Sequence, residues 1–346
     1  MIIRSRAPLR LGFAGGGTDL PAFSDIYGGS VLNATINQYA HCTLIETNSS
    51  NIVFNASDIE ISEELNINSE ISLNGKLPLH RAVYKRFIND YNLRPASFTL
   101  NTYSDVPPGS GLGSSSTLVV SMIKVFSEWF NIPMGEYDIA KLAYEIERID
   151  LGFSGGKQDQ YAASFGGFNF MDFNKNGSVV INPLSIKPRI INELSENLLL
   201  YYSGISRSAA EISDSIIDEQ NSNVDNKINE SVIAMKATKK ISHDMKNAFI
   251  LGNIEEIASL MNKSWEHKKQ TAQKVSNNEL DEMFNLALKN NAKACKLSGA
   301  GGGGFSIFLV DPIDRHDFIR FLENYSKGYI LNCEFTNNGC HSWRVK

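Results

Sequence analysis

Apolar and polar residues alternate along several short stretches of the chain. In residues 5–14, Leu9, Leu11 and Phe13 fall on one side, while Arg10 and Gly12 fall on the other. A period of two is typical of a β-strand that has one face in a core. The same reasoning predicts strands over 40–47, 51–56, 97–106, 197–204 and 329–336, and a hairpin of 168–173 and 178–186 around the turn 174–177.

Other stretches repeat their apolar residues every three or four positions, which is typical of an amphipathic helix. In residues 116–131, the positions Leu118, Met122, Val125 and Trp129 form such a stripe. Further helices are predicted from Pro78 to 91, over 136–150, 157–165 and 314–325, and as a block over about 208–292 that is rich in Lys, Asn and Glu. Residues 293–310 are expected to form a loop followed by a strand.

The order of these elements predicts the fold class α+β, with separate layers of strands and helices. A chain of 346 residues is long enough for about two domains. The region from Pro183 to Pro188 is the best candidate for a boundary. We therefore expect an N-terminal domain over 1–185 and a C-terminal domain over 186–346.

Composition narrows the class of protein. Hydrophobic residues make up 42% and charged residues 21%, as in ordinary globular proteins. A net charge of −5 argues against a protein that wraps nucleic acid. The N-terminus lacks the apolar segment of a signal peptide, and no run is long enough to span a membrane. The four cysteines have no CxxC spacing, which argues against zinc or a disulfide framework, so we expect a cytoplasmic protein.

A loop rich in glycine and serine precedes the helix of residues 116–131. It reads PPGSGLGSSST over 107–117, with three glycines and four serines. Bare backbone N–H groups and a helix N-terminus can converge on an anion, and the hydroxyls of 114–116 can cap the helix or bind phosphate or Mg²⁺. A plain loop with a serine cap is the alternative. The loop matches neither the Walker pattern nor a dinucleotide fingerprint.

Two further stretches are rich in glycine. GGGTDLPAF, residues 15–23, follows the first strand, and Asp19 beside open backbone suits sugar hydroxyls; otherwise Asp19 caps the next segment. Arg10 can reach the same space, or forms a surface salt bridge. LSGAGGGGFSIFLV, residues 297–310, has four consecutive glycines, 301–304, directly before an apolar strand. Such a backbone either fits closely against another loop or a ligand, or is a flexible connector.

These three stretches, in this order, resemble the motifs of the GHMP kinase superfamily, the small-molecule kinases named for galactose, homoserine, mevalonate and phosphomevalonate. The motifs stand as RAPLRLGFAGGGTDLPAF, PPGSGLGSSST and KLSGAGGGGFSIFLV, and they are spread over nearly the whole chain. The resemblance implies a two-domain fold, in which an N-terminal domain like the second domain of a ribosomal small-subunit protein packs on a ferredoxin-like C-terminal domain. It also implies ATP in the cleft, Mg²⁺, and a small-molecule acceptor.

The resemblance further implies the roles of individual residues. Asp159 matches the base of galactokinase-like members, and Arg10 the basic residue of the first motif. Ser115 and Glu147 match the metal ligands; without the family, Glu147 would be an exposed partner of Arg148 or Lys141, and Asp159 a helix cap. The phosphates of ATP are assigned to Pro108, Gly109, Ser110, Gly111, Leu112, Gly113, Ser114, Ser115 and Ser116. The acceptor is assigned to Gly16, Gly17, Thr18, Asp19, Lys157, Arg207, Gly301 and Gly302.

The acceptor itself is also an inference from resemblance. GGG at 15–17 replaces the GEH of galactokinases, which puts galactose in doubt. The strings at 15–23, 155–170 and 201–212 look most like superfamily members that phosphorylate the anomeric hydroxyl of D-glycero-D-manno-heptose 7-phosphate and so supply nucleotide-activated heptose for bacterial surface polysaccharide. The distal phosphate needs a cation, for which Arg207 is the first candidate and Lys157 the second.

Two alternatives and one question of assembly stay open at this point. The chain can be a fucokinase-like enzyme that acts on an unphosphorylated sugar, or a non-catalytic sensor of sugar and ATP. A sensor has no need of a base, so the combination of Ser115, Glu147 and Asp159 argues against it. We expect no nucleic-acid or membrane partner; the number of chains that assemble stays open, with a homodimer as the candidate.

Overall fold

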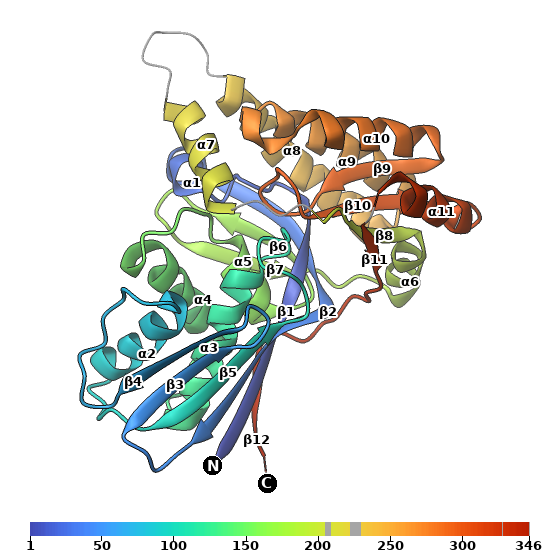
Figure 1. The fold of residues 1–346 in the computed structure, drawn as a ribbon. Helices are drawn as coiled ribbons and strands as arrows, with labels where there is room; N and C mark the ends of the chain where they lie inside the picture. Colours follow the sequence, from blue (N-terminus) through green and yellow to red (C-terminus); the bar gives the residue numbers. More distant parts are fainter. Residues whose placement is uncertain (205–208, 222–229, 327, 346) are drawn as a thin grey trace.

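A computed structural model gives the structure of residues 1–204, 209–221, 230–326 and 328–345. Within these residues the strands form one sheet of eight strands and one of four, and helices lie against both (Figure 1). The predicted class, α+β, is confirmed. The first and last strands lie side by side, so the two ends of the chain are close together.

The large sheet is built on two long strands. β1 (Ile2–Ala14) and β2 (Gly29–Glu46) pair antiparallel, and the register places Arg10 opposite Thr35. The order is β12-β1-β2-β5-β3-β4, and β6 pairs with β2 and β7. The remaining strands are β3 (Asn51–Ala56), β4 (Ile61–Asn66), β5 (Phe98–Ser104), β6 (Phe168–Phe173), β7 (Val179–Pro183) and β12 (His341–Val345). As the sequence predicts, Leu9, Leu11 and Phe13 are fully buried, and each contributes about 1.5–3 kcal/mol by burial.

Helices cover one face of this sheet. A single core joins the sheet to α2 (Pro78–Asp90), α3 (Ser114–Phe130) and α4 (Glu136–Glu145). Its centre is aromatic, with the ring of Phe98 edge-on to those of Phe126 and Trp129 at 5.4 and 5.3 Å. This packing holds the C-terminal half of α3 against the sheet. Two shorter helices, α1 (Pro21–Tyr27) and α5 (Gln158–Phe165), follow the glycine turns near the cleft described below.

The small sheet has the order β11-β8-β10-β9, and all its pairs are antiparallel. Its strands are β8 (Leu198–Tyr202), β9 (Ala292–Leu297), β10 (Phe305–Val310) and β11 (Tyr329–Leu331). With the helices between them, they follow the β-α-β-β-α-β order of a ferredoxin-like fold, as expected. The helices of this half are α6 (Pro188–Asn197), α7 (Ala209–Asn221), α8 (Glu230–Leu251), α9 (Ile254–Lys269), α10 (Asn278–Lys289) and α11 (Arg315–Tyr325).

The two halves share a core. It includes Leu11 and Phe13 of β1, Phe249 of α8, Leu260 of α9 and Ile307 of β10. The chain changes from the large sheet to the small one between β7 and β8, but its last strand, β12, returns to the large sheet. The division into 1–185 and 186–346 stays a prediction, and as drawn it leaves β12 out of the sheet to which it pairs.

The structure differs from the predicted elements at several places. Residues 293–297, expected as loop, belong to β9, where pairing with β10 defines the strand, and the buried Lys296 interrupts the apolar pattern that would have predicted it. The helix predicted over 136–150 ends at Glu145 and continues as a π-helical turn, Ile146–Asp150. The block of 208–292 is several helices, and the strand of 329–336 is shorter than expected. Elements without a prediction are α1, α6, β4, β12 and the first half of β2.

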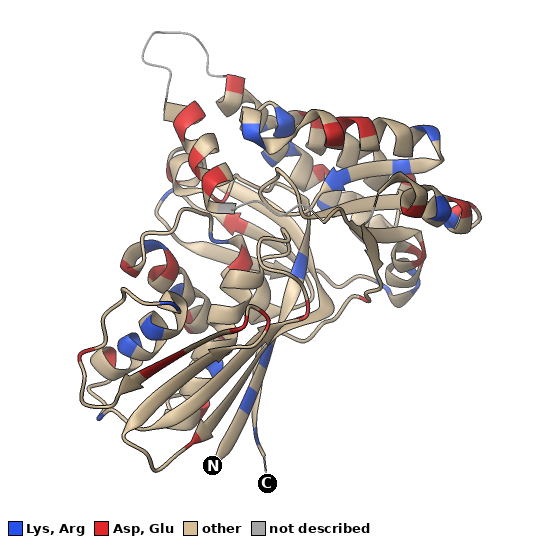
Figure 2. Cartoon of the chain, in the orientation of Figure 1, with Lys and Arg blue, Asp and Glu red and all other residues tan. Residues whose placement is uncertain are grey.

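Charge and hydropathy agree with a globular protein. Acidic and basic residues both appear on α8, α10 and α11, whereas α7 carries acidic residues alone (Figure 2). None of the helices in the described ranges is long and apolar enough to cross a membrane.

Candidate active site

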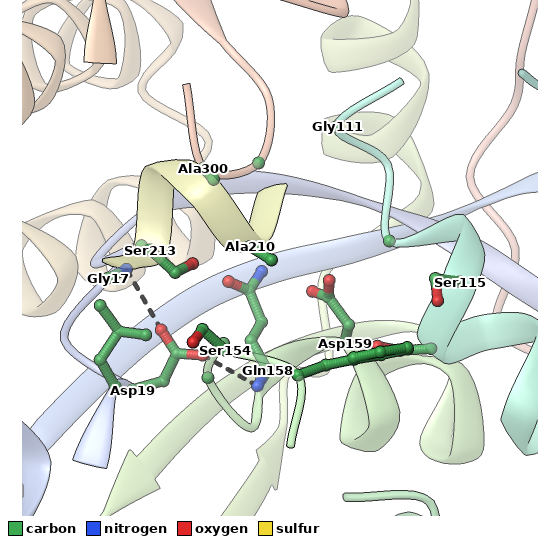
Figure 3. Close-up of a pocket in the computed structure, with 18 of the residues that line it drawn as sticks. Gly17, Asp19, Gly111, Ser115, Ser154, Gln158, Asp159, Ala210, Ser213 and Ala300 are labelled. Carbon is green, nitrogen blue, oxygen red and sulfur yellow. Dashed lines mark hydrogen bonds between the residues drawn. The ribbon is translucent and has the colours of Figure 1, made fainter. Parts of the chain in front are cut away.

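A cleft of about 410 Å³ opens where the two halves meet. Three loops reach it: the first glycine loop (residues 15–20), the central glycine loop (107–113) and the C-terminal glycine loop (298–304). The starts of α3 and α5 form its floor, and α7 and the end of α9 lie over it. Figure 3 shows residues of the three loops and of α3, α5 and α7 converging on one space.

The central glycine loop needs its glycines. Gly109, Gly111 and Gly113 have φ values of 71°, 83° and 79°, in the left-handed region that side chains disfavour. A methyl group on Gly111 would lie 2.6 Å from the carbonyl oxygen of Ser298, and one on Gly113 would lie 3.0 Å from Cγ of Asp159. The loop is therefore bare because two other segments press against it.

The C-terminal glycine loop is one of those segments. The N–H of Phe305 donates to the carbonyl of Ser110 at 2.9 Å, and a methyl group on Gly299 would lie 2.5 Å from the carbonyl oxygen of Gly111. The interpretation of this stretch as backbone fitted closely against another loop is confirmed. Only small residues let the two loops approach this far.

The serines after the central loop do not cap α3. The N-cap is Gly113, and no side chain completes the cap, so the expectation of a serine cap is wrong. The hydroxyls instead point to Glu147: Ser116 donates to Oε1 at 3.0 Å, and Ser115 lies 3.5 Å from the same oxygen. Free N–H groups at the helix start are left facing the cleft, where they favour an anion.

Glu147 lies in the π-helical turn and is only 1% exposed. Its Oε2 accepts a hydrogen bond of 2.5 Å from Nε2 of Gln160, and Nη1 of Arg148 is 3.9 Å from Oε1. Burial raises the pKa of Glu147, and Arg148 and the hydrogen bonds oppose that rise. The alternative of an exposed ion pair is wrong, because a carboxylate this deep needs these partners.

Arg10 and Asp159 form the centre of the floor. Nε and Nη2 of Arg10 lie 2.8 and 2.7 Å from Oδ1 of Asp159. Nη1 of Arg10 donates to the carbonyl of Gly111 at 2.7 Å and reaches the hydroxyl of Ser298 at 3.4 Å. Arg10 is 5% exposed, so the alternative of a surface salt bridge is wrong. Asp159 is not a cap either, because the N-cap of α5 is Lys157, whose own side chain makes no cap hydrogen bond.

Asp19 ties the first glycine loop to α5. Its Oδ1 accepts from the N–H of Gly17 at 3.1 Å, and its Oδ2 accepts from the N–H of Gln158 at 3.0 Å (Figure 3). A methyl group on Gly156 would overlap this carboxylate. Burial raises the pKa of Asp19, the bond from Gln158 opposes that rise, and the charge of Asp159 adds to it. Asp19 thus caps α5, which is distant in sequence, and not the segment that follows it.

Several predicted residues lie outside the cleft lining. Thr18 is fully buried: its hydroxyl lies 2.8 Å from the carbonyl of Gly15 and accepts from the N–H of Ser30, so it fixes the turn. Lys157 is buried with its ammonium 5.4 Å from the ring centre of Tyr144. Arg207 lies outside the described residues. Pro108, Ser110, Leu112, Gly301 and Gly302 are also absent from the lining, whereas Gly16, Gly17, Gly109 and Ser114 belong to it.

The cleft also contains residues that the sequence did not single out. Gln158 points its amide into the cleft beside the carboxylate of Asp159 (Figure 3), and Nε2 has no partner within the described ranges. Ala210 and Ser213 of α7 face it from above. Lys268, near the end of α9, and Arg148 supply two more cations. Neighbours of a motif, such as Gln158 and Arg148, could have been considered; Lys268 has no local signature.

Comparison with known proteins gives the family. Residues 78–167 match the GHMP kinases N terminal domain, and residues 245–327 match the GHMP kinases C terminal domain. The D-glycero-alpha-D-manno-heptose 7-phosphate kinase of Campylobacter jejuni is 47% identical over 347 residues, which cover 99% of this chain and 99% of that protein. The chain belongs to the GHMP kinase family. It is therefore a kinase that uses ATP.

Two other relatives of this GHMP kinase bear on its fold and its acceptor. The crystal structure of a D-glycero-D-manno-heptose 1-phosphate kinase from Bacteroides thetaiotaomicron has a TM-score of 0.84 and 42% identity, and covers 99% of both chains. The bifunctional fucokinase/GDP-fucose pyrophosphorylase of Arabidopsis thaliana is 26% identical over 90% of this chain but 30% of that protein. The two-domain fold is thus shown, and heptose phosphate kinases resemble this chain more closely than the fucokinase does.

Proposed function

We propose that this GHMP kinase transfers the γ-phosphoryl group of ATP to the anomeric hydroxyl of D-glycero-D-manno-heptose 7-phosphate, giving the 1,7-bisphosphate that leads to nucleotide-activated heptose. The observation that carries the proposal is the contact between Asp159 and the central glycine loop. A methyl group on Gly113 would touch that carboxylate, and Arg10 bonds both to it and to the carbonyl of Gly111. A base for an alcohol and a cradle for phosphates thus share one floor.

The reaction is written with these residues. The anomeric oxygen attacks the γ-phosphorus, the bond from that phosphorus to the β–γ bridging oxygen breaks, and ADP leaves with the bonding pair. The hydroxyl proton passes to Asp159, which Arg10 holds in place at 2.7–2.8 Å. The N–H groups of the central loop and of the start of α3 bind the phosphate oxygens. Because phosphoryl transfer depends mainly on position and charge, this rigid floor supplies most of what the chain must provide.

Magnesium fits the residues at the start of α3. Magnesium is usually held by one or two carboxylates together with substrate phosphates, and the described residues contain no cluster of three or more His, Cys, Asp or Glu that would hold a metal alone. Glu147 and the Ser115 hydroxyl are the groups that would hold it. When bound, Mg²⁺ neutralises phosphate charge. Gln160 and Ser116 orient the Glu147 carboxylate in its absence.

The two relatives are named for different acceptors, one as a heptose 7-phosphate kinase and the other as a heptose 1-phosphate kinase. The acceptor of this chain therefore has to be measured. The test is ADP release with heptose 7-phosphate, heptose 1-phosphate, free heptose, fucose and galactose, with NMR of the product. Turnover of the 7-phosphate with a new phosphate at C1 supports the proposal. Turnover of free fucose or of the 1-phosphate instead contradicts it, and binding without any turnover would favour a sensor.

The distal phosphate of the acceptor needs a cation beyond the described floor. Arg207, between β8 and α7, stays our candidate, since Lys157 is buried against Tyr144 and Gly177. We expect Arg207→Ala to raise the KM for the sugar phosphate at least tenfold with little change in the KM for ATP. An unchanged KM for the sugar phosphate would show that another cation meets the distal phosphate.

We place the reaction in the cytoplasm, where ATP is available and thiols stay reduced; the four cysteines are all free. We also retain the homodimer as part of the proposal. Sedimentation of the purified protein at micromolar concentration tests it, and a single species of about 38 kDa would contradict it.

A further inference from the structure

Lys268 lies in the last turn of α9, lines the cleft and is only 5% exposed. Its ammonium donates to the carbonyl of Gly299, and a methyl group on Gly16 would lie 3.5 Å from its Nζ. Gly299 in turn packs on Gly111 of the central loop. Lys268 therefore stands between the loop that receives phosphates and the loop that borders the acceptor, which is the line along which the phosphoryl group moves.

The bonds of Arg10 and Lys268 differ. The guanidinium N–H groups of Arg10 donate hydrogen bonds to Asp159, Gly111 and Ser298. An ammonium has three N–H donors, and within the described ranges Gly299 is the acceptor that Lys268 reaches. Arg10 thus holds the floor together, whereas Lys268 keeps donors for a ligand in the cleft.

Charges from every side face this ammonium. Arg10 of β1, Asp19 of the first loop, Asp159 of α5 and Lys296 of β9 all interact with it. Burial, and then the charge of Arg10, lower the pKa of Lys268 to about 8, while the two carboxylates oppose that change. A buried cation among other cations is stabilised when an anion arrives between them. The terminal phosphate of ATP is such an anion.

We propose that Lys268 is a catalytic residue of this kinase, which donates a hydrogen bond to an oxygen of the γ-phosphoryl group during its transfer. The identity of the acceptor in this inference rests on the proposed function, whereas the use of ATP as the donor follows from the family. Since charge is spread over the phosphoryl oxygens in the transition state, a donor fixed there stabilises that state more than bound ATP. Removing one such donor typically costs 10²–10³ in rate.

The test compares Lys268→Met with Lys269→Met, a matched control whose ammonium pairs with Glu266 and Asp281 outside the cleft. We expect Lys268→Met to lower kcat about 100-fold with less than threefold change in the Kd for ATP. Calorimetry with ADP and aluminium fluoride in the presence of the sugar phosphate should show an affinity loss of tenfold or more, because this complex resembles the transition state. The control should keep both values.

A pH profile separates catalysis from support of the loop. Wild-type kcat/KM should fall above a pH of about 8, since Lys268 loses its proton there. Lys268→Arg should move this limb to higher pH and retain more rate than Lys268→Met, in which the limb should be absent. A merely structural bond to Gly299 predicts weaker ATP binding with an unchanged pH limb, and that result would overturn the proposal.

The two proposals fail in different ways. If wild-type enzyme does not turn over heptose 7-phosphate, the proposed acceptor is wrong, and the Lys268 variants are then measured with the sugar from the panel that is turned over. If wild-type enzyme turns over heptose 7-phosphate and Lys268→Met matches it in kcat, only the role of Lys268 is wrong.

Discussion

The floor and the roof of the cleft are built in opposite ways. The floor, formed by Arg10, Asp159, Gly113 and Glu147, is a closed network in which every charged group has partners and the glycines admit no side chain. The roof, formed by α7 and Lys268, faces the same space from the small half of the molecule, where Lys268 donates to the carbonyl of Gly299. Under the proposed mechanism, the large half holds the reacting groups in this network, while the small half supplies groups that bind the ligands. Substitutions that affect the two surfaces differently can test this contrast.

The largest effect is expected for Asp159→Asn. Asparagine keeps the shape and can still accept from Arg10, but it cannot take the hydroxyl proton, so kcat should fall at least 10³-fold with ATP binding nearly unchanged. Asp150→Asn, which alters a carboxylate that is paired with Arg86 at 2.6 Å and does not line the cleft, is the control. A loss of less than tenfold in steady-state turnover would contradict the role of Asp159 as the base.

Gly113→Ala should come next. It adds strain at a φ of 79° and places a methyl group 3.0 Å from Cγ of Asp159, so we expect kcat/KM to fall about 100-fold and stability to drop by about 1–2 kcal/mol. Gly177→Ala is a matched control, since Gly177 has a φ of 81° with nothing within 4 Å of the added methyl group. Equal kinetic loss in both variants would mean that backbone strain alone, without crowding of Asp159, explains the effect.

Glu147→Gln tests the buried end of the floor. The amide keeps the volume but removes the charge, so the Mg²⁺ concentration for half-maximal rate should rise about tenfold or more. Glu145→Gln changes a carboxylate two residues earlier that pairs with Arg86 instead, and should leave the Mg²⁺ dependence alone. Titration of initial rate with Mg²⁺ is the measurement, and full rate at limiting Mg²⁺ would exclude Glu147 as a ligand.

Ser213→Ala sharpens the contrast from the roof. One neutral hydrogen bond is worth about 0.5–1.5 kcal/mol, so the KM for the sugar phosphate should rise about two- to tenfold with kcat kept. Ser215→Ala, on the same helix but outside the cleft lining, should have no effect. A fall in kcat without a change in KM would mean that Ser213 acts in the chemical step, as the groups of the floor are proposed to do. The contrast between floor and roof would then be wrong.

The smallest effect on catalysis is expected for Glu63→Gln, which breaks a rigid ion pair outside the cleft. Arg81 holds the pKa of Glu63 at about 2, so the pair stabilises the fold above the unfolded pKa near 4.5 and loses that effect as pH falls toward 2. The variant should melt at a lower temperature at pH 7, and the gap should close as pH falls. An unchanged kcat would show that this ion pair stabilises the fold without affecting catalysis.

Sequence reasoning succeeded where local chemistry leaves a pattern. The three glycine stretches and the alternation around Arg10 led to the residues that line the floor, because close approach of backbones demands glycine and a half-buried strand alternates. Their assigned roles remain predictions. It failed for the start of β2, where Asn33 and Thr35 are buried polar residues that break the apolar pattern.

The roof had no comparable signal. Lys268 is one lysine in a lysine-rich helical block, and only the packing of α9 against β9 and β1 turns it inward. β12 was missed for a similar reason, since a strand of five residues is defined by its pairing with β1 rather than by its own composition.

The pairing of β12 with β1 has a consequence for synthesis. Residues 341–345 close the outer edge of the strand that carries Arg10, and Ile2 pairs with Val345. A nascent chain therefore displays that edge to other chains until residues 341–345 have left the ribosome. Deleting residues 341–345 would leave every glycine motif intact and still expose this edge of β1.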